Sequence, residues 1–241
     1  MPKVPAVTAI RRVGHKGAGL IAPGNTLASF DAALAAGVDM IEFDILPADD
    51  TGELVLAHDR GAARRGSPPT LEEGLAHLSS PAFEGLDFDV DIKGPGYEDR
   101  VVEALQRHGL VERSLVCAQY PRSLDRVREL DPALRLGWSV PRASTDYTTT
   151  PLLGWLAVAA LLVYRRLLPR RASRALRSGR VDAIMANWRL VTPRLVDAVR
   201  GAGGDLYAWT VDDAARIRTL AGLGVTGVIS NDPRLFSALA P

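Results

Sequence analysis

The stretch Met40-Ile41-Glu42-Phe43-Asp44-Ile45 decides the fold prediction for this chain. It is an apolar run interrupted by two carboxylates, and such a run is typical of a buried strand in a parallel sheet. Alternate residues of a strand point to the same face, so Glu42 and Asp44 are expected to face one common centre. Burying unpaired carboxylates costs several kcal/mol, so their placement predicts a functional role rather than a contribution to stability.

Charged side chains also end other predicted strands. His15 follows the first apolar run, and His58 ends a short hairpin-like run. Asp91 and Lys93 stand two residues apart at the end of the run 86–92, so alternation again places both on one face. Carboxylates, histidines and a lysine gathered at strand ends predict an enzyme that holds a divalent metal ion beside an anionic substrate.

The composition is ordinary for a globular protein. The 241 residues are 47% hydrophobic and 24% charged, which suits one α/β domain with a large core. A net charge of +1 gives no reason to expect nucleic-acid binding. Cys117, the single cysteine, excludes an internal disulfide and is expected to be a buried core thiol. We find neither a signal peptide nor the ~20 apolar residues of a membrane span, so we expect a cytoplasmic protein.

Strand-like and helix-like patterns alternate along the whole chain. We expect strands at 9–14, 39–45, 54–58, 86–92, 114–118, 134–140, 181–186, 206–210 and 225–230. We expect helices at 26–36, 70–78, 98–108, 122–130, 152–178, 192–201, 213–220 and 232–239.

The run 54–58 follows the preceding strand too closely for a crossover helix, so we expect it to pair as a short extension near the barrel mouth. The other eight strands and eight helices predict an α/β fold, a (β/α)8 TIM barrel that forms a single domain over residues 1–241. A doubly wound sheet is the alternative. Against it, Gly14, Gly17 and Gly19 do not have the spacing of a dinucleotide-binding loop.

The carboxylates and histidines suggest specific chemistry. Glu42, Asp44 and Asp91 supply the hard oxygen ligands that Mg²⁺ or Ca²⁺ prefers, with room for substrate oxygens and water. We therefore expect one divalent metal ion as the cofactor. His15 and His58, flanking a metal-bound phosphodiester, can serve as general base and general acid.

Two lysines complete the predicted site. Lys93 can stabilise charge on phosphoryl oxygens, and Lys16 precedes a helix whose N-terminus, capped by Asn25 or Thr26, favours an anion. Other readings stay open for Lys93, which can form an ion pair inside the barrel or serve as a Schiff-base lysine. Borohydride trapping would identify the latter.

Eight motifs, in this order, resemble the glycerophosphodiester phosphodiesterase family over nearly the whole chain. They are His15-Lys16-Gly17, Pro23-Gly24-Asn25-Thr26, Gly37-Val38-Asp39, Ile41-Glu42-Phe43-Asp44, His58-Asp59, Asp91-Ile92-Lys93, Trp209-Thr210-Val211 and Gly227-Val228-Ile229-Ser230-Asn231-Asp232-Pro233. The resemblance implies a TIM barrel that hydrolyses glycerophosphodiesters to an alcohol and glycerol 3-phosphate with a bound divalent cation. It implies His15 and His58 as the acid/base pair, Glu42, Asp44 and Asp91 as metal ligands, Lys93 as a phosphate contact and Trp209 lining the glycerol or alcohol side.

The chain departs from the family pattern at three positions. Lys16 replaces an arginine, which should loosen phosphate recognition, and Gly24 replaces a glutamate near the entrance. Asp91 replaces a glutamate, and an aspartate at this place is similar to the related sphingomyelinase D and lysophospholipase D barrels. Only residues 60–69 separate His58 from the next helix, so an open mouth is expected.

These departures leave alternative functions open. The apolar and arginine-rich stretch 152–180 can be a barrel helix with a basic face, or a patch that docks on the inner face of a membrane. In the second case the substrate is a lysophospholipid and the enzyme a lysophospholipase D. A non-catalytic phosphoester-binding barrel is a further alternative. Whether catalysis uses a cyclic phosphate or direct attack by water also stays open.

Overall fold

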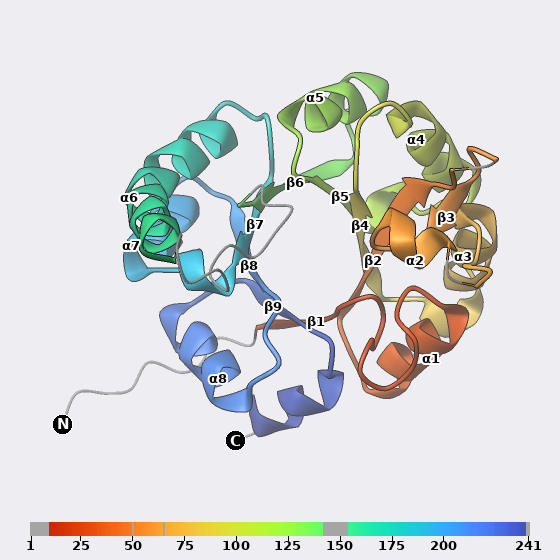
Figure 1. Ribbon diagram of the computed structural model, residues 1–241, viewed down its shortest axis with the longest axis horizontal. Helices are drawn as coiled ribbons and strands as arrows, with labels where there is room; N and C mark the ends of the chain where they lie inside the picture. Colours follow the sequence, from red (N-terminus) through yellow and green to blue (C-terminus); the bar gives the residue numbers. More distant parts are fainter. Residues whose placement is uncertain (1–9, 50, 65, 142–153, 240–241) are drawn as a thin grey trace.

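The computed structural model describes residues 10–49, 51–64, 66–141 and 154–239. Eight parallel strands close into a barrel, because β1 pairs with β2 on one side and with β9 on the other (Figure 1). The strands are β1 (Arg11–Gly14), β2 (Met40–Pro47), β4 (Asp87–Ile92), β5 (Ser114–Ala118), β6 (Arg135–Val140), β7 (Ala183–Asn187), β8 (Asp205–Trp209) and β9 (Gly227–Ser230). The predicted TIM barrel is confirmed.

A ninth strand, β3 (Leu54–Leu56), pairs antiparallel with the end of β2. It lies beside the last residues of β2, at the end of the barrel where the parallel strands terminate. This confirms the short extension expected near the mouth, although the strand ends before Ala57 and His58.

Helices surround the barrel as the alternating pattern predicts (Figure 1). They are α1 (Leu27–Ala35), α3 (Leu71–Leu78), α4 (Glu98–Arg107), α5 (Pro121–Leu130), α6 (Gly154–Arg177), α7 (Pro193–Arg200) and α8 (Ala214–Leu223). Thr26 caps α1: its side chain accepts from the Ser29 backbone N–H, as the sequence suggested. Of the predicted helix 152–178, the first two residues lie outside the described residues.

Two segments differ from the prediction. A short helix, α2 (Arg60–Arg64), follows His58 and was not predicted; the Asp59 carboxylate accepts from the Ala62 N–H in its first turn. The C-terminal segment η5 (Pro233–Leu239) is a 3₁₀ helix rather than an α-helix. It packs against β1 and α8 with Phe236 buried, so tertiary packing sets its geometry more than helix propensity does.

The core has two layers. Between strands and helices lies the larger cluster, which includes Phe30, Phe43 and Phe88. Inside the barrel lies a smaller one that includes Met40 and Tyr207. The inner cluster fills the barrel below the strand ends, so only the mouth remains for a site.

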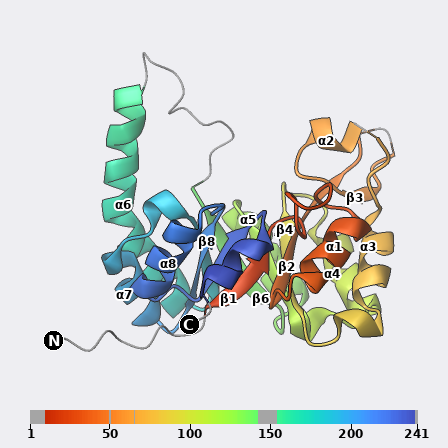
Figure 2. The same cartoon turned by 90° about the horizontal axis from the view of Figure 1, so that it is seen from below.

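Helix α6 is the longest helix, and it reaches well beyond the barrel at the mouth end (Figure 2). Its C-terminal half packs on the barrel through Leu168, Ala172 and Leu176. No helix in the described part of the chain is both long and apolar enough to cross a membrane.

Filling space inside the barrel should destabilise the fold. A Cβ at Gly137 would lie 2.4 Å from the Cys117 sulfur and 3.1 Å from Met185 Cγ, whereas a Cβ at Gly222 on α8 meets no atom within 4 Å. We expect Gly137→Ala to lower the free energy of unfolding by about 1–3 kcal/mol. Gly222→Ala should leave it unchanged or raise it slightly, because alanine favours a helix. Urea unfolding of both variants tests this, and equal midpoints would contradict it.

Candidate active site

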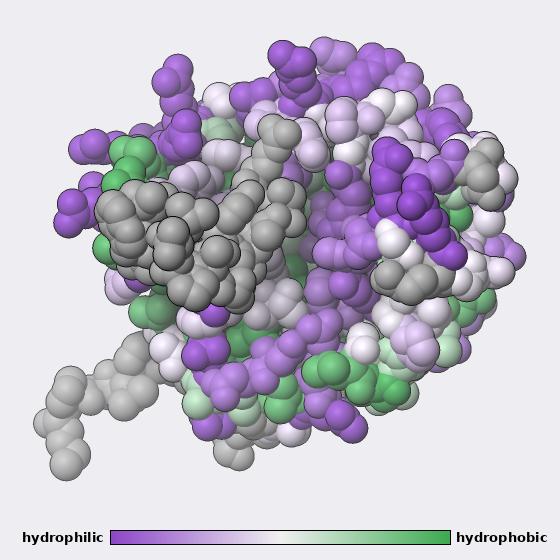
Figure 3. Space-filling model, in the orientation of Figure 1, coloured by the Kyte–Doolittle hydropathy of each residue, from purple (hydrophilic) through white to green (hydrophobic). Residues whose placement is uncertain are grey.

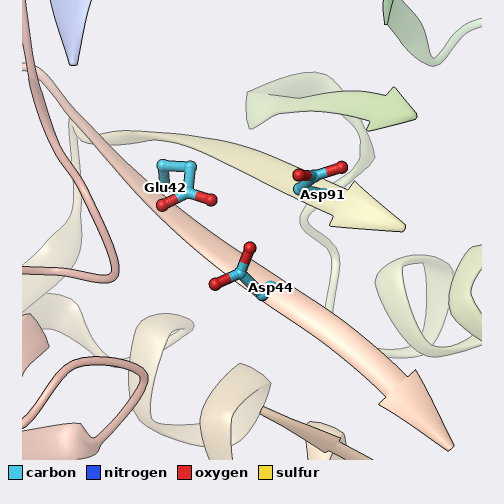
Figure 4. Close-up of side chains that lie close together, drawn as sticks. All are labelled: Glu42, Asp44 and Asp91. Carbon is cyan, nitrogen blue, oxygen red and sulfur yellow. The ribbon is translucent and has the colours of Figure 1, made fainter. Parts of the chain in front are cut away.

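Four acidic side chains enter the barrel from two neighbouring strands. The register of β2 and β4 places Glu42 opposite Asp89 and Asp44 opposite Asp91. All four side chains therefore point inward in two successive layers near the C-terminal ends of the strands. Figure 4 shows Glu42, Asp44 and Asp91 converging from the two strands.

Lys93 lies against this cluster. Its ammonium group is 2.6 Å from an Asp91 oxygen and contacts an Asp44 oxygen directly. Asn25 fixes the other side of Asp44, because its amide donates to Asp44 Oδ2 at 2.8 Å and its oxygen accepts from the Asp44 N–H at 3.1 Å. The Glu42 carboxylate accepts from the Lys16 backbone N–H at 2.7 Å. Asp44 and Glu42 are thus held in place before any ligand binds.

Burial and mutual charge shift the proton affinities of these groups. Burial raises the pKa of Glu42 and of Asp91, and the Asp44 charge acts in the same direction. Burial would also raise the pKa of Asp44, but the attraction of Lys93 and His15 outweighs it and lowers that pKa. Burial disfavours the Lys93 ammonium, yet Asp91 and Asp44 hold its pKa well above the usual range. A lysine kept protonated in this way is a poor Schiff-base nucleophile.

A chain of hydrogen bonds orients His15. Its Nδ1 lies 2.6 Å from the side-chain oxygen of Asn231. Asn231 donates its amide N–H to Asp212 at 2.7 Å and its backbone N–H to the same carboxylate at 2.8 Å. The Asn231 oxygen therefore faces the ring as an acceptor, which assigns the proton to Nδ1 and leaves Nε2 with a free lone pair, 3.8 Å from Glu42. Burial lowers the pKa of His15 to about 4, so the ring is neutral at pH 7.

His58 occupies a more open position at the start of the β3–α2 loop. Its side chain is 49% exposed, against 16% for His15. Its Nδ1 lies 3.4 Å from the Asp59 carboxylate, which also caps α2. The two histidines thus stand in contrasting surroundings, because His15 is largely buried and His58 is exposed to solvent.

One cavity joins most of the predicted site residues. It measures about 110 Å³ and opens at the barrel mouth. Figure 3 looks into this end and shows hydrophilic side chains around its centre. Of the predicted residues, His15, His58, Glu42, Asp91, Lys93 and Trp209 line it. Asp44 is fully buried beneath them, and the Trp209 indole N–H donates to the Met185 carbonyl at 2.8 Å, which fixes the ring.

Lys16 is the predicted residue that lies apart. Its side chain lines a neighbouring groove of about 500 Å³, which shares His58 with the cavity. Lys16 has a left-handed backbone with φ of 53°, a strained conformation for a residue other than glycine. A Cβ at Gly24 would lie 2.9 Å from Lys16 Cβ, so the lysine stem runs close over that glycine.

Four residues of the site were not predicted in these roles: Asn25, Asp89, Asp212 and Asn231. Asp89 precedes Asp91 by two residues, so strand alternation places both side chains on the same face. The sequence therefore did contain a signal for Asp89. For Asn25 the sequence predicts only a role as a helix cap. The contact of Asn231, itself held by Asp212, with His15 joins distant parts of the chain and follows from barrel closure.

The carboxylates fit a divalent cation. Glu42, Asp44 and Asp91 each offer an oxygen atom within 4.8 Å of the others, which suits three ligands of one hard cation. Asp91 Oδ1 and Asp89 Oδ1 are buried and have no hydrogen-bond partner among the described residues. Buried acceptors without donors are compatible with a positively charged ligand in the cluster.

Comparisons with known proteins agree with one another. The family model described as "Glycerophosphoryl diester phosphodiesterase family" matches residues 15–67 and 67–235. A glycerophosphodiester phosphodiesterase of Caldanaerobacter subterraneus is 25% identical, over 92% of this chain and 93% of its own.

Solved structures share the fold. A glycerophosphodiester phosphodiesterase from Agrobacterium tumefaciens superposes with a TM-score of 0.70 at 19% identity, covering 96% of this chain and 100% of its own. An Oleispira antarctica phosphodiesterase, solved in complex with sn-glycerol-3-phosphate, gives 0.69 at 20% identity, covering 94% and 95%.

Without a cation, the buried acidic cluster should make stability fall as pH rises. Burial raises the pKa of Asp89 to about 7 from 3.8, so the folded protein keeps a proton that the unfolded chain releases. Its contribution is fully present below the unfolded pKa and is lost as pH rises through the folded pKa. Asp89 should therefore make the Tm of EDTA-treated protein fall, relative to that of Asp89→Asn, between about pH 4 and about pH 7. Asp89→Asn should reduce this slope, and an equal slope in both proteins would contradict the assignment.

Proposed function

The chain belongs to the glycerophosphoryl diester phosphodiesterase family, a family of phosphoric diester hydrolases, and from this membership we propose that it hydrolyses glycerophosphodiesters to an alcohol and glycerol 3-phosphate. The observation that carries the proposal is that one cavity brings together both histidines and the acidic cluster. A merely binding barrel would gain nothing from burying this many carboxylates beside a neutral histidine. We further propose that residues 1–241 act as one such domain.

We propose Glu42, Asp44 and Asp91 as the ligands of one divalent metal ion, Mg²⁺ or Ca²⁺. When bound, this cation supplies positive charge to the phosphoryl oxygens and lowers the pKa of an attacking hydroxyl. The residues themselves prepare the site, because Asn25 and the Lys16 N–H hold Asp44 and Glu42 in position. Since Lys93 contacts Asp44 and Asp91, its ammonium would compete with a bound cation for these two carboxylates.

The two histidines take different parts in this proposal. His15 is neutral at pH 7 with its Nε2 lone pair free, so it is suited to remove a proton from the attacking hydroxyl. His58, at the open edge of the cavity, is suited to protonate the departing alcohol oxygen.

The attacking hydroxyl is either the glycerol 2-hydroxyl or water. With the first, a cyclic phosphate forms and water then opens it, with the proton transfers reversed. With the second, glycerol 3-phosphate forms directly. In both cases the attacking oxygen forms a P–O bond and the P–O bond to the alcohol breaks. Lys93 stabilises the negative charge on the phosphoryl oxygens.

The remaining residues are assigned to the substrate. Trp209, fixed through its indole N–H, presents a flat apolar side to the glycerol or alcohol portion. Lys16 offers a second positive charge from the adjoining groove. A lysophospholipid is a second candidate substrate, because that groove beside His58 provides room of about 500 Å³ for a bulkier group. The expected cytoplasmic location stays a prediction.

Replacement of either site histidine should remove most of the activity. His15→Ala and His58→Ala are each expected to lower kcat on glycerophosphocholine by about 10²–10⁴, because each loses a proton-transfer group. The other two histidines provide matched controls. His77 and His108 pair with Asp31 and Glu72 on the outer helices, so His77→Ala and His108→Ala should keep full activity. Losses below tenfold at both site histidines would reject the acid/base assignment.

Metal removal should abolish turnover and restoration should recover it. We expect EDTA to stop glycerol 3-phosphate formation, as followed by ³¹P NMR, and Mg²⁺ or Ca²⁺ to restore it. Asp91→Asn should raise the cation concentration needed for half-maximal stabilisation, measured as a rise in Tm, by at least about tenfold. Asp197→Asn, which removes an exposed carboxylate on α7, is the control. Full activity in EDTA would overturn the metal assignment.

A further inference from the structure

The outward face of α6 divides into an apolar tip and a basic lower part. Leu162, Val163 and Leu167 are exposed by 52%, 57% and 46% of their surface. Five exposed arginines lie on the same face, the first of them between Val163 and Leu167 and the others below Leu167. Helical spacing places Arg166, Arg170, Arg171, Arg174 and Arg177 on the side away from the buried Leu168 and Ala172.

These arginines have no acidic partners in the described part of the chain. Helix α6 itself contains no aspartate or glutamate, and no carboxylate of the described residues forms an ion pair with them. Three of them, Arg170, Arg174 and Arg177, line an open groove of about 650 Å³ together with Arg194 at the start of α7. Elsewhere on the outer helices several arginines are paired, as Arg126 is with Asp99 and Arg107 with Glu72.

The position of α6 places the upper part of this face beyond the barrel mouth. The N-terminal half of the helix rises past the barrel on the side where the parallel strands end, which is the side of the cavity (Figure 2). Leu162 and Val163 lie on the raised part, and Arg166 follows one turn below, about 6 Å closer to the barrel. Arg170 lies about 12 Å from Leu162 along the axis. In a helix placed end-on against a bilayer, Leu162 and Val163 would reach the acyl chains, and the arginines below them would lie at the level of the headgroups.

A second group of exposed apolar side chains lies at the same end of the barrel. Leu20 and Ile21, in the loop that leads from β1 to α1, are 62% and 40% exposed. With the three apolar residues of α6, they are the large hydrophobic side chains most exposed in the described part of the chain. The mouth is therefore flanked on two sides by exposed apolar groups.

We propose that α6 and the Leu20–Ile21 loop form a docking surface for an anionic lipid bilayer, which brings the barrel mouth against the membrane. A bilayer accepts apolar side chains among its acyl chains and arginines among its anionic headgroups. A second copy of the chain fits less well, because a two-fold contact through this face would set five unpaired arginines against five others. Resting on the proposed function, this surface makes lysophospholipids held in the membrane a substrate class of the same site.

Vesicle binding tests the surface without relying on turnover. The full-length protein is sedimented with phosphatidylcholine vesicles, with and without phosphatidylglycerol, at low and high salt. We expect binding to the anionic vesicles only, weakened by salt. The double variant Leu162→Ser with Val163→Ser should lose at least about tenfold in partitioning, because the apolar tip is removed.

Charge variants give an independent measurement. Arg166→Glu should lower partitioning to anionic vesicles about tenfold. Arg218→Glu makes the same change at an exposed, unpaired arginine on α8 and should leave binding unchanged. Both should keep wild-type turnover of soluble glycerophosphocholine and wild-type Tm. Failure of that turnover in every protein would reject the proposed function while leaving the vesicle result to stand.

Three outcomes would overturn the docking surface: no binding to anionic vesicles at low salt, equal losses from Arg166→Glu and Arg218→Glu, or binding that survives loss of the apolar tip. Dimerisation of the wild type that the serine variant abolishes, without vesicle binding, would show a self-association surface instead.

Discussion

The structure depends on one electrostatic constraint, the burial of four carboxylates beside a single lysine at the mouth of a closed barrel. Glu42, Asp44, Asp89 and Asp91 face inward from neighbouring strands, and Lys93 neutralises only part of their charge. Burial and mutual repulsion raise the pKa values of Glu42, Asp89 and Asp91, so the cluster without a cation favours the binding of protons. A divalent cation would replace those protons, so metal binding and proton release are linked at this site.

The same constraint explains the surroundings of the cluster. Asn25 and the backbone N–H of Lys16 are donors to carboxylates that the barrel interior deprives of water. The loop after β1 has to bend sharply to bring them there, and the left-handed backbones of Lys16 and Asn25 are the result. His15 then sits where burial keeps it neutral, while the Asp212–Asn231 pair fixes its tautomer. The acid-base role proposed for His15 rests on this placement by the loops.

Much of this arrangement could be predicted because strand alternation is local. Glu42 with Asp44, and Asp91 with Lys93, needed only the two-residue period and the rule that barrel sites lie at strand ends. Register between strands is not local, and the pairing of Glu42 with Asp89 could not be read from either strand alone. Contacts such as Asn231 with His15 join distant parts of the chain and appear only when β1 and β9 close the barrel. The projection of α6 past the mouth was likewise hidden, since helical periodicity says nothing of where a helix ends relative to a sheet.

Two of the departures from the family pattern, Lys16 and Gly24, are linked in space. The stem of Lys16 passes so close to Gly24 that a Cβ there would fall 2.9 Å from the lysine Cβ. A glutamate at position 24 would therefore push the residue at position 16 onto another course, and a glycine allows the lysine to lie flat along the groove beside His58. The two residues therefore depend on each other, because the glycine leaves space for the lysine stem and both line the groove beside His58. A groove of about 500 Å³ with a lysine along it, next to the exposed histidine, fits the proposal of a leaving group larger than a small alcohol.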